Sequence, residues 1–84
     1  MKGARTMQID WFKIIVDIER AGMTQQQISK SIQVSKSTLY GWKAGAVPRY
    51  DDGEALIRLW ELTTDRAPQE IPYTRFFQSR YRKL

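Results

Sequence analysis

One short stretch of the chain carries polar side chains at helical spacing: Lys36, Ser37, Tyr40 and Lys43. Residues three and four apart share one side of a helix, so these ammonium and hydroxyl groups can act together as hydrogen-bond donors and acceptors. The chain has no Cys and no His, which removes the thiolate and the imidazole from its possible metal ligands and acid–base groups. The sequence therefore predicts recognition of a polar surface. It predicts neither an enzyme nor a cofactor, and no small-molecule ligand is evident.

Two short helices joined by a tight turn are predicted around these side chains, over residues 24 to 45. Thr24 can cap the first helix while Gln27 reaches back to the Thr24 amide, which is the reciprocal arrangement of a capping box. Ser35 is placed to cap a second helix that runs from residue 36 to about 44, and Gly45 suits the left-handed conformation that ends it. Helices this short are marginal in water, so their apolar faces must pack against each other. The residues available for this packing are Ile28, Ile32, Val34, Leu39 and Trp42.

This stretch resembles the helix-turn-helix of the lambda-repressor and Cro family of phage and bacterial regulators. The family's opening Gln matches Gln25, and its apolar positions match the five residues just given. The chain departs from the family at two positions, with Ser29 where Ala is usual and Gln33 where Gly is usual in the turn. Ser29 is small enough for close helix contact, whereas Gln33 needs a left-handed backbone that costs about 1 to 2 kcal/mol. The resemblance implies an all-α fold, a small bundle of four to five helices with the helix-turn-helix at its centre.

The resemblance also implies a function, which is sequence-specific binding of double-stranded DNA by a transcriptional regulator of the repressor type. Helix 36–44 is expected in the major groove, where Lys36, Ser37, Tyr40 and Lys43 meet base edges. Gln25 is expected to bond a phosphate by resemblance, and amides at helix starts attract anions. The full set expected on the DNA backbone is Gln25, Gln26, Lys30, Ser35 and Arg49.

The charge distribution agrees with an anionic partner. Lys and Arg number 14 against 9 acidic residues, giving a net charge of +5, which favours nucleic acid or an acidic membrane surface. Between Glu19 and Asp51 there is no acidic residue, so the positive field is expected around the helix pair. A second interpretation remains, an adaptor domain that uses the same helices to bind another protein and does not bind DNA.

The rest of the chain divides into an N-terminal arm (1–8), the helix-turn-helix domain (9–63) and a C-terminal loop with a basic aromatic tail (64–84). Asp10 is expected to cap a first helix that carries an apolar stripe. Asp51 is expected to cap a last helix in which Glu54 is the third residue. Besides Trp42, the aromatic residues expected in the core are Trp11, Phe12 and Trp60, and the last helix is expected to bury Leu56, Leu59, Trp60 and Leu62.

The tail has an aromatic pattern of its own. As a helix it would place Tyr73, Phe77, Tyr81 and Leu84 on one face, which predicts a homodimer surface. Two other interpretations together carry as much weight as dimerisation: the tail folds back on its own domain, or it is a basic arm that orders on DNA.

Charged residues interrupt the apolar run near the start of the chain at Lys13, Asp17 and Glu19. The run therefore fits neither a signal peptide nor a membrane span. A soluble, intracellular protein is expected from this, and the family resemblance implies the cytoplasm of a bacterial or phage-infected cell.

Overall fold

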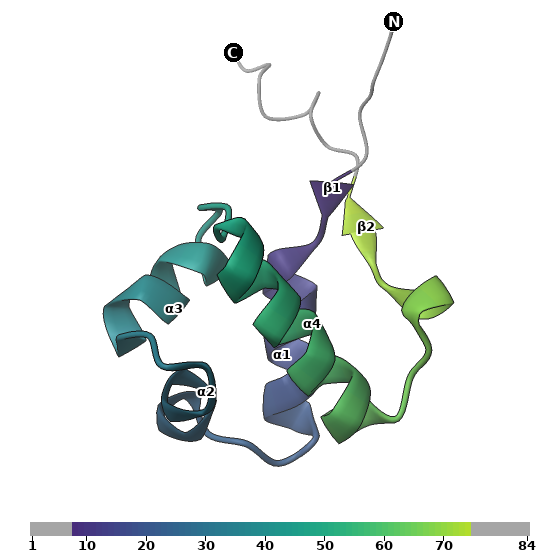
Figure 1. Ribbon diagram of the computed structural model, residues 1–84, viewed down its shortest axis with the longest axis horizontal. Helices are drawn as coiled ribbons and strands as arrows, with labels where there is room; N and C mark the ends of the chain where they lie inside the picture. Colours follow the sequence, from purple (N-terminus) through teal and green to yellow (C-terminus); the bar gives the residue numbers. More distant parts are fainter. Residues whose placement is uncertain (1–7, 75–84) are drawn as a thin grey trace, which may run out of the picture.

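A computed structural model describes residues 8 to 74 (Figure 1). In this part the chain forms, in order, β1 (Gln8–Ile9), α1 (Trp11–Arg20), α2 (Gln25–Ile32), α3 (Lys36–Lys43), α4 (Tyr50–Thr64), the 3₁₀ turn η1 (Pro68–Glu70) and β2 (Tyr73–Thr74). The helical architecture is as expected. The sequence did not predict the antiparallel pair β1–β2, in which Gln8 lies opposite Thr74 and Ile9 opposite Tyr73.

The first two helices begin at the caps predicted for them. Asp10 accepts a hydrogen bond from the Lys13 amide at 3.1 Å. Thr24 and Gln27 form the complete capping box, with N···O distances of 2.8 and 3.1 Å. Each side chain satisfies an amide that has no partner within the helix, so the start of each helix is set locally.

The turn between α2 and α3 also follows the prediction. Gln33 adopts a left-handed backbone with φ of 61° and ψ of 48°, the strained geometry that the absence of Gly implied. Ser35 then caps α3 by accepting from the Thr38 amide at 3.1 Å. Gly45 follows the C-cap residue Ala44 and has a φ of +124°, where a side chain would be strained.

The core lies where α1 and α4 meet and where α2 and α3 pack onto them (Figure 1). Its eight buried members are Ile14, Ile15, Ile18, Ile28, Leu39, Trp42, Leu56 and Trp60, with Trp11, Ile32, Val34 and Leu59 partly buried around them. Two expectations were wrong, because Phe12 is 52% exposed and Leu62 is 76% exposed. Both residues fall off the buried stripe of their helix, since each step along a helix turns the side chain by about 100°.

Helix α4 begins at Tyr50, two residues earlier than the Asp51 cap predicted. Its N-cap position is Arg49, which makes no capping side-chain bond, and Asp51 lies inside the first turn. The predicted capping box at Asp51 and Glu54 is therefore wrong, and Glu54 instead accepts from the Tyr50 hydroxyl at 3.2 Å. Asp51 still favours the helix start, because a negative charge there complements the helix dipole.

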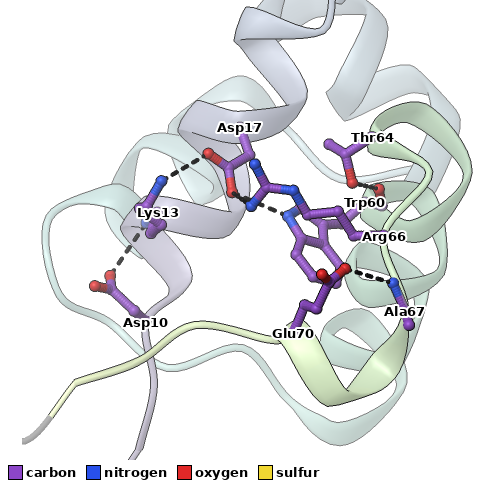
Figure 2. Close-up of polar contacts among 8 residues, drawn as sticks. All are labelled: Asp10, Lys13, Asp17, Trp60, Thr64, Arg66, Ala67 and Glu70. Carbon is purple, nitrogen blue, oxygen red and sulfur yellow. Dashed lines mark hydrogen bonds and ion pairs between the residues drawn. The ribbon is translucent and has the colours of Figure 1, made fainter.

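A buried carboxylate ties α1 to α4 and to the segment after it (Figure 2). Asp17, 6% exposed, accepts a 3.1 Å hydrogen bond from the indole N–H of the fully buried Trp60. The same carboxylate pairs with Lys13 at 3.0 Å and with Arg66 at 3.5 Å. A buried charge is stable only when it is paired and hydrogen-bonded, and three donors meet that requirement here.

These contacts also bring the segment from residue 65 to 74 back onto the domain. Asp65 ends α4 in a left-handed conformation, and Glu70 accepts from the Ala67 amide at 3.0 Å (Figure 2). Ile71 then packs against the core, and the carbonyl of Pro72 accepts from the Asp10 amide at 2.9 Å. The chain thus returns beside its own beginning and forms β1–β2.

The strand β2 corrects one expectation for the tail. Tyr73 lies in an extended strand and is 52% exposed, so it does not start a helix that shares a face with Phe77, Tyr81 and Leu84. Those three residues lie outside the described part of the chain.

Protonation of Asp17 is expected to destabilise the fold. Burial alone would raise the pKa of Asp17, but the hydrogen bonds from Trp60 and Lys13 and the charges of Lys13 and Arg66 outweigh it and lower the pKa. A folded-state pKa below the unfolded value contributes stability above the unfolded pKa, and this contribution is lost as pH falls through the folded pKa. The free energy of unfolding should therefore decline from about pH 5 downwards, measured by urea unfolding at a series of pH values.

Asp17→Asn should flatten that decline, because the variant has no carboxylate to protonate at this site. Asp65→Asn is the matched control, since Asp65 is exposed and Asn tolerates its left-handed backbone. Equal flattening by both variants would mean that the Asp17 network does not dominate the acid sensitivity.

The two leucines Leu39 and Leu62 offer a matched test of the core. Leu39 is fully buried beneath α3, so Leu39→Ala should lower the free energy of unfolding by about 2 to 5 kcal/mol. Leu62→Ala should change it by less than about 0.5 kcal/mol, because Leu62 faces solvent. Chemical denaturation of both variants measures the difference, and similar losses would contradict the packing described for α3.

Candidate nucleic-acid interface

The outward side of α3 carries most of the polar side chains singled out in the sequence. Lys36, Ser37 and Tyr40 are all exposed, and Tyr40 presents 65% of its surface to solvent. Leu39 and Trp42 face the opposite way into the core. The helix therefore holds an ammonium group and two hydroxyl groups outward, while its apolar side fixes it to the domain.

A cluster of hydroxyl groups marks the start of α3. Ser35 Oγ lies 2.9 Å from Thr38 Oγ1 and 3.2 Å from Ser37 Oγ, in addition to capping the helix. Thr38 is exposed and belongs to this cluster, although it is not among the residues predicted from the sequence. Its position three residues after the Ser35 cap was the available signal. Hydroxyl groups beside the free amides of a helix start can receive an anionic oxygen.

Lys43 lies elsewhere than expected. The sequence predicts Lys43 on the solvent-exposed face of its helix. Its side chain is instead only 19% exposed and turns toward α1. Its ammonium nitrogen lies 3.2 and 3.3 Å from the two carboxylate oxygens of Glu19. The pair neutralises the charge of Lys43 and joins the end of α3 to the end of α1, so the structure gives Lys43 a positioning contact within the protein.

The residues expected on a DNA backbone are spread over three elements. Gln25 at the first position of α2 is half-buried, and Gln26 beside it is exposed. Lys30 is exposed further along α2, Ser35 caps α3, and Arg49 is exposed at the start of α4. The structure thus leaves these side chains accessible around the helix pair. Among the residues predicted to contact DNA, the close polar contact in the described part of the chain is the one between Ser35 and Ser37 in the hydroxyl cluster.

A glycine on α3 leaves its backbone open to the outside. Gly41 has an ordinary helical conformation, and a Cβ built on it would meet nothing within 4 Å. Internal packing therefore does not require Gly at this position, although Gly inside a helix costs about 1 kcal/mol relative to Ala. A missing side chain here allows a partner surface to approach the helix backbone closely.

Comparison of the chain with family models, with curated proteins and with solved structures gives no match. Among residues 8 to 74, no helix combines the length and the apolar character that crossing a membrane demands.

The Lys43–Glu19 ion pair can be tested by a double-mutant cycle. Lys43→Gln and Glu19→Gln, singly and together, should give a coupling free energy of unfolding of about 0.5 to 1 kcal/mol, because both side chains are partly shielded from water. Urea unfolding at low and high salt measures it, and the coupling should shrink with salt. A coupling indistinguishable from zero at low salt would show that the pair does not hold α3 to α1.

Proposed function

We propose that this protein is a transcriptional regulator of the phage or prophage repressor type that binds double-stranded DNA sequence-specifically and inserts α3 into the major groove. The observation that carries the proposal is the outward face of α3, where Lys36, Ser37 and Tyr40 stand exposed on a helix anchored by its buried side. The major groove is about 12 Å wide, and a helix with its side chains is about 10 to 12 Å across. One helix therefore fits it.

The chemistry of this face supports reading of base edges. Lys36 can donate to guanine acceptors, and the hydroxyl groups of Ser37 and Tyr40 can donate or accept. In this arrangement the amides and side chains at the start of α2, with Gln25 and Gln26, bond phosphates and set the angle of approach. Lys43 can contact base edges only if DNA displaces Glu19 from its ammonium group. Its main contribution to binding is therefore to hold the orientation of α3.

The proposal includes a homodimer on DNA. A single small module covers about 600 to 1,000 Å² of interface, and repressors of helix-turn-helix type commonly use two copies on half-sites one helical turn apart. Sedimentation of the full chain at micromolar concentration, with and without a DNA duplex that carries two half-sites, tests this part.

A second candidate, an adaptor domain that binds another protein, draws support from exposed apolar residues. Phe12 and Val47 are 52% and 64% exposed and line one open hollow beside the end of α3. Binding of a protein there would depend weakly on salt, whereas binding of DNA falls steeply as salt rises. A gel-shift series across salt concentration separates the two candidates.

Substitutions on α3 should separate specificity from general affinity. Ser37→Ala and Tyr40→Ala should weaken binding to a DNA site selected from a random pool by about 1 to 3 kcal/mol and leave binding to random DNA nearly unchanged. Gln25→Ala should weaken both by a similar factor, because a phosphate contact carries no sequence information. Fluorescence anisotropy at fixed salt measures the affinities, with Arg58→Ala, at an exposed position of α4, as the control. If Ser37→Ala and Tyr40→Ala keep the full preference for the selected site, α3 is not the reading helix.

Substitution of Gly41 should raise the stability of the fold and lower the affinity for DNA. Gly41→Ala should raise the free energy of unfolding by about 0.5 to 1 kcal/mol, since Ala favours the helix and its methyl group meets open space. The same methyl group should lower affinity for DNA if α3 lies against the groove. Thermal unfolding and anisotropy on one preparation measure both effects, and a more stable variant with undiminished affinity would show that the partner does not approach over Gly41.

A further inference from the structure

The accessible side chains of α3 offer two different kinds of group to a partner. Lys36, in the first turn, carries an ammonium group, which has three donors and no acceptor. Tyr40, one turn further on, presents 65% of its surface to solvent and offers an aromatic ring besides its hydroxyl group. Lys43 at the end of the helix is occupied, because its ammonium group is paired with Glu19 at 3.2 Å. The face therefore has a donor at its start and an aromatic ring in its middle.

The ammonium group of Lys36 favours one base over the other three. In the major groove guanine presents two acceptors, N7 and O6, thymine presents one, and adenine and cytosine each present an amino donor. Lys36 is exposed and forms no ion pair within residues 8 to 74, so it can reach an acceptor. Helix α3 contains no Asp, Glu, Asn or Gln, the side chains that pair with cytosine or adenine. The chemistry of the helix thus points to guanine.

The ring of Tyr40 is uncovered because its neighbours on the helix are small or turned away. Ser37, Gly41 and Ala44 lie on the same side of α3 and have short side chains or none. A Cβ built on Gly41 would meet nothing within 4 Å, so the helix surface next to Tyr40 is open. Lys43, three residues after Tyr40, turns toward α1. The apolar group that such a ring can meet in the major groove is the C5-methyl group of thymine.

The spacing of the two side chains limits how far apart their bases can be. Four residues of helix separate Lys36 from Tyr40, which is a rise of about 6 Å. Successive base pairs are about 3.4 Å apart along the duplex axis. Two side chains on one helix at this separation therefore reach bases that are at most about two steps apart.

From these groups we infer that the DNA site of this protein contains a guanine that accepts from Lys36 and, within about two base-pair steps, a thymine whose methyl group packs against the Tyr40 ring. The inference rests on the proposed function and names the bases that α3 reads. In it Tyr40 selects thymine through its ring, and the Tyr40 hydroxyl group is dispensable for that choice.

Base analogues, placed one at a time in the site selected from a random pool, test each contact separately. Deoxyuridine in place of thymine removes only the methyl group, and 7-deazaguanine in place of guanine removes only the N7 acceptor. Deoxyuridine at the position that Tyr40 reads should weaken binding about fourfold, as expected for one buried methyl group. 7-Deazaguanine at the position that Lys36 reads should weaken it about tenfold, because a hydrogen bond from a charged donor is lost. Fluorescence anisotropy at fixed salt measures the affinities, and the same analogues outside the covered site should have no effect.

Matched variants connect each analogue to its side chain. Tyr40→Phe keeps the ring and should keep the sensitivity to deoxyuridine, whereas Tyr40→Ala should lose it. Lys36→Met keeps the apolar stem without the ammonium group, so 7-deazaguanine should no longer weaken its binding. Both positions are exposed, so thermal unfolding of each variant should match that of the parent.

The outcomes distinguish this inference from the proposed function. If no thymine of the selected site responds to deoxyuridine, or if Tyr40→Ala responds as strongly as the parent, the inference is wrong for Tyr40. If Lys36→Met stays as sensitive to 7-deazaguanine as the parent, it is wrong for Lys36. In these cases a maintained preference for the selected site leaves the proposed function standing. If the random pool yields no preferred site, the proposed function fails and this inference fails with it.

Discussion

The hydrogen bond between the buried Trp60 indole and Asp17 is the contact on which the rest of this domain depends. It joins the middle of α1 to α4 across 43 positions of sequence, and it makes a buried carboxylate tolerable. Arg66 reaches the same carboxylate, so the chain that leaves α4 is drawn back across α1. That return brings β2 beside β1. One buried acid thus joins the core helix pair to the segment that leads into β2.

Two kinds of contact hold α3, which carries the candidate interface, on the rest of the domain. Leu39 and Trp42 bury the inner side of α3, which sets its distance from the core. The pair of Lys43 with Glu19 then ties the end of α3 to the end of α1, which limits rotation of the helix about its axis. Side chains that recognise a partner need a defined orientation, and packing together with one partly shielded ion pair gives α3 a defined orientation.

The exposed face of α3 offers hydroxyl groups more than charge. Residues 8 to 74 contain eight basic and nine acidic residues, so this part of the chain is nearly neutral. On α3 itself Lys43 is paired with Glu19, whereas Lys36 is exposed beside the hydroxyl groups of Ser37 and Tyr40. The face therefore favours directional hydrogen bonds over a strong positive field.

The sequence by itself determined the local features: the capping box of Thr24 and Gln27, the Ser35 cap, and the left-handed turn at Gln33. Each depends on residues within four positions, so neighbouring side chains and backbone sterics decide it. Only the tertiary structure decided that Lys43 turns toward Glu19, that Phe12 and Leu62 face solvent, and that Gln8 pairs with Thr74. Those outcomes depend on which surfaces meet after distant segments pack, and a two-residue strand pair leaves almost no periodic signal in the sequence.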